Sequence, residues 1–145
     1  MKILVIITVY NEEENLSKTL NSFINQSYPI YQITIVNDGS SDSSSQIIKE
    51  LSKKYKSINY VSKKDSKSYA KPGKKIIKAF NYGLKRSIKD YDLIGKFDGD
   101  IILPKNYFKK MVEFFRNDKK LGMSSGILAS KEKNKLKINN DYNKN

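Results

Sequence analysis

The segment ILVIITV, at Ile3–Val9, is an unbroken run of apolar and β-branched side chains. Such runs are typical of strands that are buried on both faces, as in a parallel sheet covered by helices. Further strands are predicted at Ile33–Val36, Ile58–Val61 and Tyr91–Phe97, and a last strand-like stretch at Leu121–Ala129. We therefore expect a mostly parallel sheet whose first strand is Ile3–Val9.

Helices are predicted between these strands, because apolar side chains recur there at the spacing of one helical face. We expect the first helix to be capped by Asn11 and to carry Glu12–Glu14 in its first turn, where the helix dipole favours negative charge. The third helix is expected from Gly73 to Ile88, and Pro104 suits the first turn of the fourth. The predicted inner faces are Leu16, Leu20, Phe23 and Ile24, then Ile47, Ile48 and Leu51, and then Ile76, Ile77, Phe80, Leu84 and Ile88.

The alternation of strands and helices favours an α/β fold, a single-domain α/β/α sandwich with a mostly parallel sheet flanked by helices. We expect this domain to cover residues 1–128. The segment at 62–72 is rich in lysine and serine and is predicted to be a loop. The polar tail at 129–145 has no helical or strand period, so we expect it to be frayed or disordered.

The composition excludes several kinds of chemistry. The 145-residue chain has no cysteine and no histidine, so it offers no disulfide, no thiolate zinc site and no Ser-His-Asp triad. Acid–base chemistry must come from Asp, Glu, Lys or Tyr. The net charge of +13 favours phosphorylated substrates, polyanions or an anionic membrane surface, although solubility alone is an alternative explanation.

Nucleic acid is not an expected partner, because Arg86 and Arg116 are the only arginines and the sequence carries no known nucleic-acid-binding motif. No apolar run reaches the ~18–20 residues that span a bilayer, and Ile3–Val9 is too short for a signal peptide. We therefore expect a cytoplasmic protein, with peripheral contact to the inner membrane surface through its basic residues as an open alternative.

Three polar clusters follow predicted strands, at Thr8–Glu12, Asn37–Ser40 and Asp98–Asp100. Ligands of open α/β sheets bind outside the carboxyl ends of the strands, so we expect the sheet to bring these clusters together. The last cluster pairs two carboxylates, which suits Mg²⁺ or Mn²⁺, although aspartates around a glycine also form turns. Neither the glycine pattern of dinucleotide-binding proteins nor that of P-loop proteins occurs in the sequence.

Each candidate residue also has a purely structural explanation. Tyr10 would pack beside the sheet, Glu12 would be a helix-start charge, and Asp38 would form an Asx-turn. Lys74 and Lys75, at a predicted helix start, would either meet phosphate oxygens or be solvated. Convergence of these groups at one sheet edge favours a ligand site over the separate explanations.

Several segments resemble signatures of family 2 glycosyltransferases. Residues 6–16 (IITVYNEEENL) and 20–29 (LNSFINQSYP) are similar to the opening of that family, and residues 33–42 (ITIVNDGSSD) to its second-strand signature. Gly73 and Lys74, followed by residues 79–84 (AFNYGL), resemble the segment before its metal motif, and Asp98-Gly99-Asp100 falls where its D-x-D is expected. The four signatures occur in the family's order over about residues 2–128.

The resemblance implies a GT-A fold and transfer of a sugar from a nucleotide-diphospho-sugar donor, assisted by Mg²⁺ or Mn²⁺, in polysaccharide or glycan biosynthesis. It implies that Tyr10 covers the nucleobase and that Asp38 accepts from a base N–H group. The full set of residues that it assigns to the nucleotide-sugar is Thr8, Tyr10, Glu12, Asp38, Lys74 and Asp98, and its metal ligands are Asp98 and Asp100.

The sequence departs from the family in its last part. The carboxylates after Asp100 are Glu113, Asp118, Glu132 and Asp141, and none matches the family's catalytic base, so we assign no base. The acceptor, whether glycan, lipid or protein, is not identified either. The chain therefore resembles the donor-binding half of the family. The alternative to an active transferase is a truncated or non-catalytic module that binds nucleotide-sugars.

Overall fold

The computed structural model describes residues 1–63, 72–132 and 135–138, so the loop expected at 62–72 lies almost wholly outside the described residues. The chain divides into two compact units, Met1–Val112 and Glu113–Asn145, and each is described by itself. The domain boundary that we expect at residue 128 falls inside the second unit.

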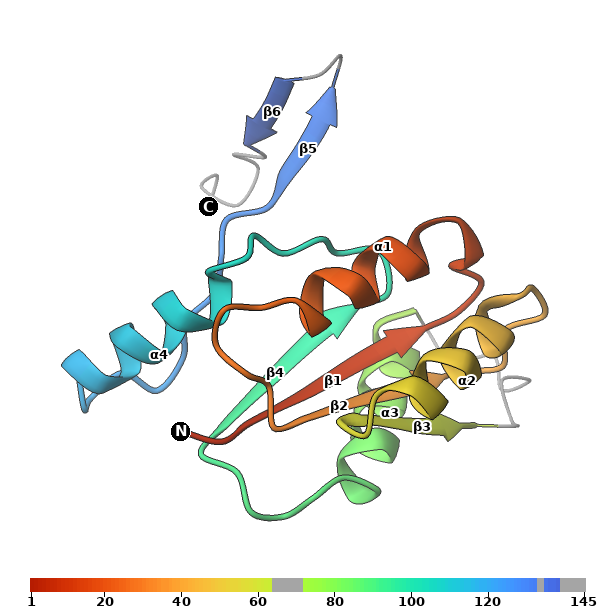
Figure 1. The fold of residues 1–145 in the computed structure, drawn as a ribbon, viewed down its shortest axis with the longest axis horizontal. Coiled ribbons are helices and arrows are strands. Elements are labelled where there is room, and N and C mark those ends of the chain that lie inside the picture. The colour runs from red at the N-terminus through yellow and green to blue at the C-terminus, as the bar shows by residue number, and fades with distance from the viewer. Residues whose placement is uncertain (64–71, 133–134, 139–145) are drawn as a thin grey trace. The chain divides into compact units, whose positions relative to one another are not determined.

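The first unit is built on a parallel sheet of four strands in the order β3-β2-β1-β4 (Figure 1). This confirms the predicted α/β fold with a mostly parallel sheet. The bounds are β1 Ile3–Val9, β2 Gln32–Asn37, β3 Ile58–Ser62 and β4 Leu93–Asp98. The apolar β1 lies between β2 and β4, so that Thr8 is in register with Val36 on one side and with Asp98 on the other.

Helices cover both faces of this sheet. Figure 1 shows α1 (Glu13–Ile24) and α2 (Ser44–Lys54) on one face and α3 (Pro72–Lys85) on the other. Side chains alternate along β1 between two cores, because successive residues of a strand point to opposite faces. One core joins Ile3, Val5, Ile7 and Val9 to Leu16, Leu20, Phe23, Ile48 and, from α4 (Tyr107–Asn117), Phe108 and Val112, and the other joins Leu4, Ile6, Val36 and Ala79.

The third helix differs from its predicted form in two ways. It ends at Lys85 and not at Ile88, since the N–H groups of Arg86 and Ser87 donate three residues back, to the carbonyls of Gly83 and Leu84. The Ser87 hydroxyl also shares a buried hydrogen bond with Thr34. Ile76 and Ile77, expected on the inner face, are 41% and 60% exposed. Phe80, Leu84 and Ile88 pack against the core as predicted, together with Ala79, and Gly83 lies against β2.

The first helix also begins differently. We expected Asn11 to cap it, but α1 starts at Glu13 with Glu12 at the N-cap and no side-chain cap bond. Asn11 adopts a φ of 54° and its side-chain oxygen accepts from the N–H of Ser41 at 2.8 Å. Its polar group therefore ties two loops together, and this is why it is not available to the helix.

The segment that leads from β4 to α4 is fastened to α1 by the side chain of Gln26. Its amide nitrogen donates to the carbonyls of Ser22 at 2.9 Å and Pro104 at 2.8 Å, and its oxygen accepts from the N–H of Phe108 at 3.2 Å. The Ser22 hydroxyl accepts from the N–H of Leu103 at 3.1 Å. Pro104 thus lies before α4, which begins at Tyr107, and not in its first turn as predicted.

The second unit contains an antiparallel pair, β5 (Ala129–Glu132) and β6 (Lys135–Ile138). The strand expected at Leu121–Ala129 is wrong, since regular strand structure begins only at Ala129. The stretch before it contains Gly122 and Gly126, and its apolar residues Met123 and Ile127 are exposed and have no strand beside them. The paired strands lie where we expected a frayed tail. Among the described residues, no helix has the length and apolarity needed to cross a membrane.

Candidate functional site

The candidate site lies at the carboxyl ends of the sheet strands. There the chain reverses its direction along the sheet, since β1 has β2 on one side and β4 on the other, and α1 and α3 cover opposite faces. Such a switch point is where open α/β sheets bind ligands. The Asp38 N–H donates to the carbonyl of Val9 at 2.9 Å, so the loops after β1 and β2 meet directly. This arrangement brings together the polar clusters that the sequence separates.

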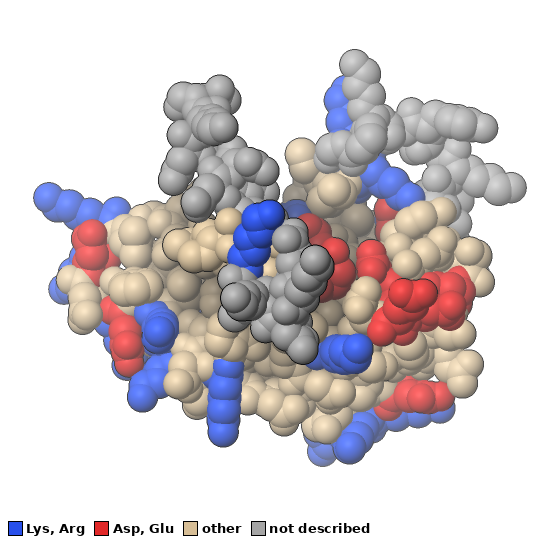
Figure 2. Space-filling view, turned by 90° about the horizontal axis from the view of Figure 1, so that it is seen from above, with Lys and Arg blue, Asp and Glu red and all other residues tan. Residues whose placement is uncertain are grey.

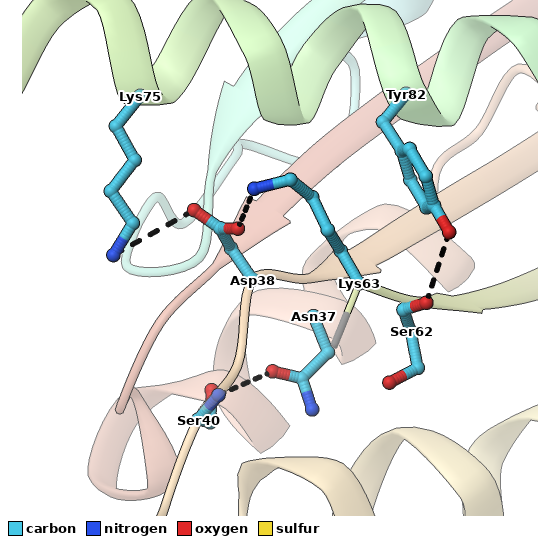
Figure 3. A network of polar contacts seen from close by, with 7 residues as sticks. All are labelled: Asn37, Asp38, Ser40, Ser62, Lys63, Lys75 and Tyr82. Atoms are coloured by element: carbon cyan, nitrogen blue, oxygen red, sulfur yellow. Dashed lines mark hydrogen bonds and ion pairs between the residues drawn. The ribbon is translucent and has the colours of Figure 1, made fainter. Parts of the chain in front are cut away.

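Asp38 is the most buried charged group of the site, with 4% of its surface exposed. Its Oδ1 accepts a hydrogen bond from Lys63 Nζ at 2.7 Å, and its Oδ2 lies 3.7 Å from Lys75 Nζ (Figure 3). Lys63 follows β3 and is held by its own N–H, which donates to the carbonyl of Asn37 at 2.9 Å. A buried carboxylate needs such partners, because charge without compensation is costly away from water.

The turn after β2 is made by Asn37 and Gly39, and not by Asp38. The side-chain oxygen of Asn37 accepts from the N–H of Ser40 at 2.9 Å, and Gly39 has a φ of 81°, which glycine adopts without strain. The Asx-turn considered for Asp38 is thus formed by its neighbour. The carboxylate of Asp38 remains directed at the two lysines (Figure 3).

Tyr10 presents its ring at the same place. The residue is 50% exposed, and Lys75 Nζ lies 3.8 Å from the centroid of its ring. Lys75 therefore contacts Tyr10 and Asp38 at once. The predicted phosphate ligand, Lys74, is exposed on the same helix, and its role stays a prediction.

Sequence reasoning missed Lys63, and it considered Lys75 only with Lys74 as a phosphate contact and not as a partner of Asp38. Lys75 belongs to the same pair at the helix start as Lys74, and successive helical residues point about 100° apart, so only the orientation of α3 selects between them. Lys63 opens a lysine-rich segment in which no spacing marks it out. The one available signal was its place directly after the third predicted strand.

The loops after β1 and β2 are joined by a further set of hydrogen bonds. The N–H of Asn11 donates to the Ser40 hydroxyl at 3.0 Å, and that of Glu12 donates to the Ser44 hydroxyl at 2.9 Å. The N–H of Glu13 donates to Asp42 at 3.0 Å. The start of α1 is thus capped by the neighbouring loop, which fixes Tyr10 and Glu12 relative to Asp38.

The predicted metal ligands lie on the other side of β1. Asp98 Oδ1 accepts from the Thr8 hydroxyl at 3.3 Å and from Lys96 Nζ at 3.1 Å. A Cβ added at Gly99 would lie 3.2 Å from Cγ of Glu12, so this turn packs directly against Glu12. Figure 2 shows acidic side chains lying in groups among the lysines of the face that it presents.

The pKa of Glu12 is raised above its usual value, first by burial and then by the negative charges of Asp100, Asp42 and Asp98. A hard divalent cation would relieve the repulsion among carboxylates that are gathered in this way. Among the described residues no group of three or more His, Cys, Asp or Glu side chains is arranged to hold a metal. Asp98 and Asp100 fit the mode in which Mg²⁺ takes one or two carboxylates and completes its shell with phosphate oxygens.

A parallel sheet with polar groups gathered at its switch point is typical of doubly wound α/β proteins, which bind their ligands at this edge. The profile of Glycosyl transferase family 2 matches residues 4–143. The chain belongs to this family, as its resemblance predicted.

Individual relatives agree with this assignment. The chain is 31% identical over 121 residues to poly-beta-1,6-N-acetyl-D-glucosamine synthase of Staphylococcus epidermidis, a match that covers 83% of this chain and 27% of that protein. It is 36% identical over 117 residues to glycosyltransferase GlyA of Streptococcus pneumoniae serotype 4, covering 78% of this chain and 15% of GlyA. The chain thus spans less than a third of the length of either relative.

Among solved structures, S. aureus TarS 1-349 in complex with UDP superimposes with a TM-score of 0.65 at 25% identity. The match covers 81% of this chain and 32% of the TarS chain. This likeness agrees with the predicted GT-A fold.

Proposed function

We propose that this chain is the donor-binding part of a glycosyltransferase. Such an enzyme transfers a sugar from a nucleotide-diphospho-sugar to an acceptor, here with the help of Mg²⁺ or Mn²⁺. The observation that carries the proposal is the meeting of Asp38, Tyr10 and Lys75 at the switch point, beside the Asp98–Asp100 turn. Family membership and the UDP bound to TarS support it.

In this proposal different side chains of the chain bind different parts of the nucleotide. The half-exposed ring of Tyr10 stacks on the nucleobase, and the carboxylate of Asp38 accepts from a base N–H group. Thr8 orients Asp98 through the hydrogen bond between its hydroxyl and that carboxylate. Glu12 lies beside the ribose end, and Lys74 at the start of α3 reaches the diphosphate oxygens.

The carboxylates of Asp98 and Asp100 would hold the divalent cation. When bound, such a cation supplies charge neutralisation for the nucleoside diphosphate that leaves the sugar. The pKa of Glu12 is raised first by burial and then by neighbouring carboxylates that include Asp100 and Asp98, and a cation held there would offset the second effect.

The rest of the reaction is not assigned to these residues. The catalytic base, the acceptor and the sugar lie outside what this donor site defines. The net charge of +13 would suit peripheral contact with an anionic membrane surface, and the synthase relative places related chemistry in polysaccharide production. We propose a cytoplasmic location at the inner membrane surface on this basis.

Nucleotide binding tests the proposal. We would titrate the chain with UDP, dTDP and GDP, each with and without MnCl₂, and follow the melting temperature and the heat of binding. A ligand at 100-fold above its Kd adds about 2.7 kcal/mol to the free energy of unfolding. Asp38→Asn should weaken binding in both conditions, whereas Asp100→Asn should remove only the gain that MnCl₂ brings.

The matched control is Asp90→Asn, which changes an exposed carboxylate before β4, at the opposite end of the sheet. It should bind nucleotide as the parent chain does. If no nucleoside diphosphate shifts the melting temperature with or without metal, the donor-binding proposal is wrong. If nucleotide-sugars bind but the chain neither hydrolyses nor transfers the sugar, it is a binding module and not a complete transferase.

A further inference from the structure

We infer that Lys96 takes the place of a metal cation at Asp98 in the empty site and moves to the diphosphate when the nucleotide binds. This inference rests on the proposed function, since it concerns the carboxylates assigned to the metal. It goes further because it gives Lys96 two effects of opposite sign. The lysine weakens the binding of a divalent cation alone and strengthens the binding of the diphosphate.

Lys96 lies on β4, two positions before Asp98, and such side chains point to the same face of a sheet. Its Nζ lies 3.1 Å from Oδ1 of Asp98, and the Thr8 hydroxyl donates to the same oxygen at 3.3 Å. The positive charge of Lys96 is therefore placed directly at a predicted metal ligand.

The carboxylates around Asp98 have few positive neighbours. Glu12 lies among them, since its pKa is raised by burial and then by the negative charges of Asp100, Asp42 and Asp98. Within the part of the chain that the structure describes, the Lys96–Asp98 contact is the one ion pair that involves Glu12, Asp98 or Asp100. Lys96 thus supplies the local positive charge of the empty site.

The ion pair of Lys96 can open easily. β4 is an edge strand, and the side chains of Lys96 and Asp98 are 41% and 54% exposed. Exposed ion pairs contribute little to stability, and lysine carries its charge on a flexible stem. The lysines of Asp38 differ, because the carboxylate that they hold is only 6% exposed. Lys96 is therefore free to exchange Asp98 for another anionic oxygen.

Without nucleotide, Lys96 makes the site a poor one for metal. A divalent cation at Asp98 and Asp100 would share the carboxylate of Asp98 with the ammonium, and like charges repel. Oδ1 of Asp98 also accepts the hydrogen bond of Lys96, which a cation at that oxygen would displace. We therefore expect the nucleotide-free chain to bind Mn²⁺ weakly.

A bound diphosphate reverses this balance. It brings negative charge to the carboxylate cluster, and its oxygens accept from an ammonium as strongly as a carboxylate does. Lys96 can then leave Asp98 without losing a charge-assisted hydrogen bond, and its charge contributes to the binding of the diphosphate. Lys96 thus makes retention of the cation depend on the nucleotide.

The test measures two affinities in the parent chain and in Lys96→Met, which keeps the length of the side chain and removes its charge. Electron paramagnetic resonance counts free Mn²⁺ while the nucleotide-free chain is titrated with MnCl₂. Calorimetry in EDTA measures the binding of UDP, dTDP and GDP without metal. We expect the variant to bind Mn²⁺ about three- to tenfold more tightly, and the diphosphate that the parent prefers about three- to tenfold more weakly, as for one exposed charge. A damaged fold would weaken both.

Two further variants are controls. Lys96→Arg keeps the charge and should keep both affinities of the parent. Lys2→Met removes an ion pair of the same exposed kind, with Asp90 at the opposite end of the sheet, and should change neither affinity.

Mn²⁺ binding that is unchanged or weaker in Lys96→Met overturns the inference, and so does diphosphate binding that is unchanged or tighter. A parent chain that binds diphosphates only with metal also overturns it. All three results leave the donor-binding proposal standing. If the parent binds no nucleoside diphosphate with or without MnCl₂, the proposed function itself is wrong, and the inference with it.

Discussion

The tight contact between α3 and the sheet can be tested with the variant Gly83→Ala. A Cβ at this position would lie 2.4 Å from Cγ2 of Val36 and 3.2 Å from Cγ2 of Ile6. Carbon atoms in van der Waals contact stay about 3.5–4.0 Å apart. Val36 and Ile6 have no exposed surface and belong to the two central strands, so neither methyl group can move aside. The helix itself must lift from the sheet by about an ångström, the difference between these distances.

Overpacking of this kind costs about 1–3 kcal/mol. Alanine in place of glycine inside a helix returns about 1 kcal/mol. Because the overlap with Val36 is large, we expect a net loss of roughly 1–2 kcal/mol in the free energy of unfolding, measured by urea denaturation. The same displacement carries Lys75 away from Asp38, so UDP binding should weaken as well.

Two comparisons make this reasoning refutable. Gly122→Ala adds a Cβ with no atom within 4 Å, and it should change the free energy of unfolding by less than about 0.5 kcal/mol. Val36→Ala removes the methyl group that the new Cβ would meet, so its cost combined with that of Gly83→Ala should be less than the sum of the two. Strict additivity in this double-variant cycle, or a Gly83→Ala chain as stable as the parent, would refute the overlap as the cause.

Two other variants test the site and its support. Glu12→Gln should raise the melting temperature at pH 7, because the pKa of Glu12 is raised in the folded chain and its charged form therefore destabilises the fold. The gain should disappear as the pH falls below about 4.3, the pKa of an unfolded glutamate, and a gain that persists at pH 3 would contradict this. Gln26→Ala should lower the free energy of unfolding in urea by about 1–3 kcal/mol, since it removes the acceptor of the Phe108 N–H and one of the two donors to the Pro104 carbonyl. Gln46→Ala, at an exposed glutamine of α2, should leave it nearly unchanged, and equal losses in the two variants would argue against the role of Gln26.

Much of the sheet could be predicted because its strands are marked by composition. The run at Ile3–Val9 is apolar at every position but Thr8 and rich in β-branched residues, which is typical of a strand with both faces covered. Helix α3 shows where this reasoning fails. Its isoleucines at 76 and 77 fit an apolar stripe, but the helix is oriented by the close approach of Gly83 to Val36, which has no signature in hydrophobicity.

The site could be predicted in outline but not in its charge partners. Tyr10 and Asp38 follow strands, so the topology alone brings them to one edge. The partners of Asp38 depend on which way two lysines point, and a sequence does not give directions. The prediction that Asn11 caps the first helix is wrong for a related reason. Its side-chain oxygen accepts a hydrogen bond from the N–H of Ser41, which lies 30 positions away in the sequence.

The place of β1 in the middle of the sheet has a consequence for how the protein is made. Thr8 and Asp98, which share a hydrogen bond, are separated by 90 positions in the sequence. At synthesis rates of about 5–20 residues per second, roughly 5–20 s pass between the appearance of β1 and that of β4. During this interval one edge of the most apolar strand has no partner, and such an edge invites pairing with other chains. The candidate site is therefore among the last parts of the first unit to form on the ribosome.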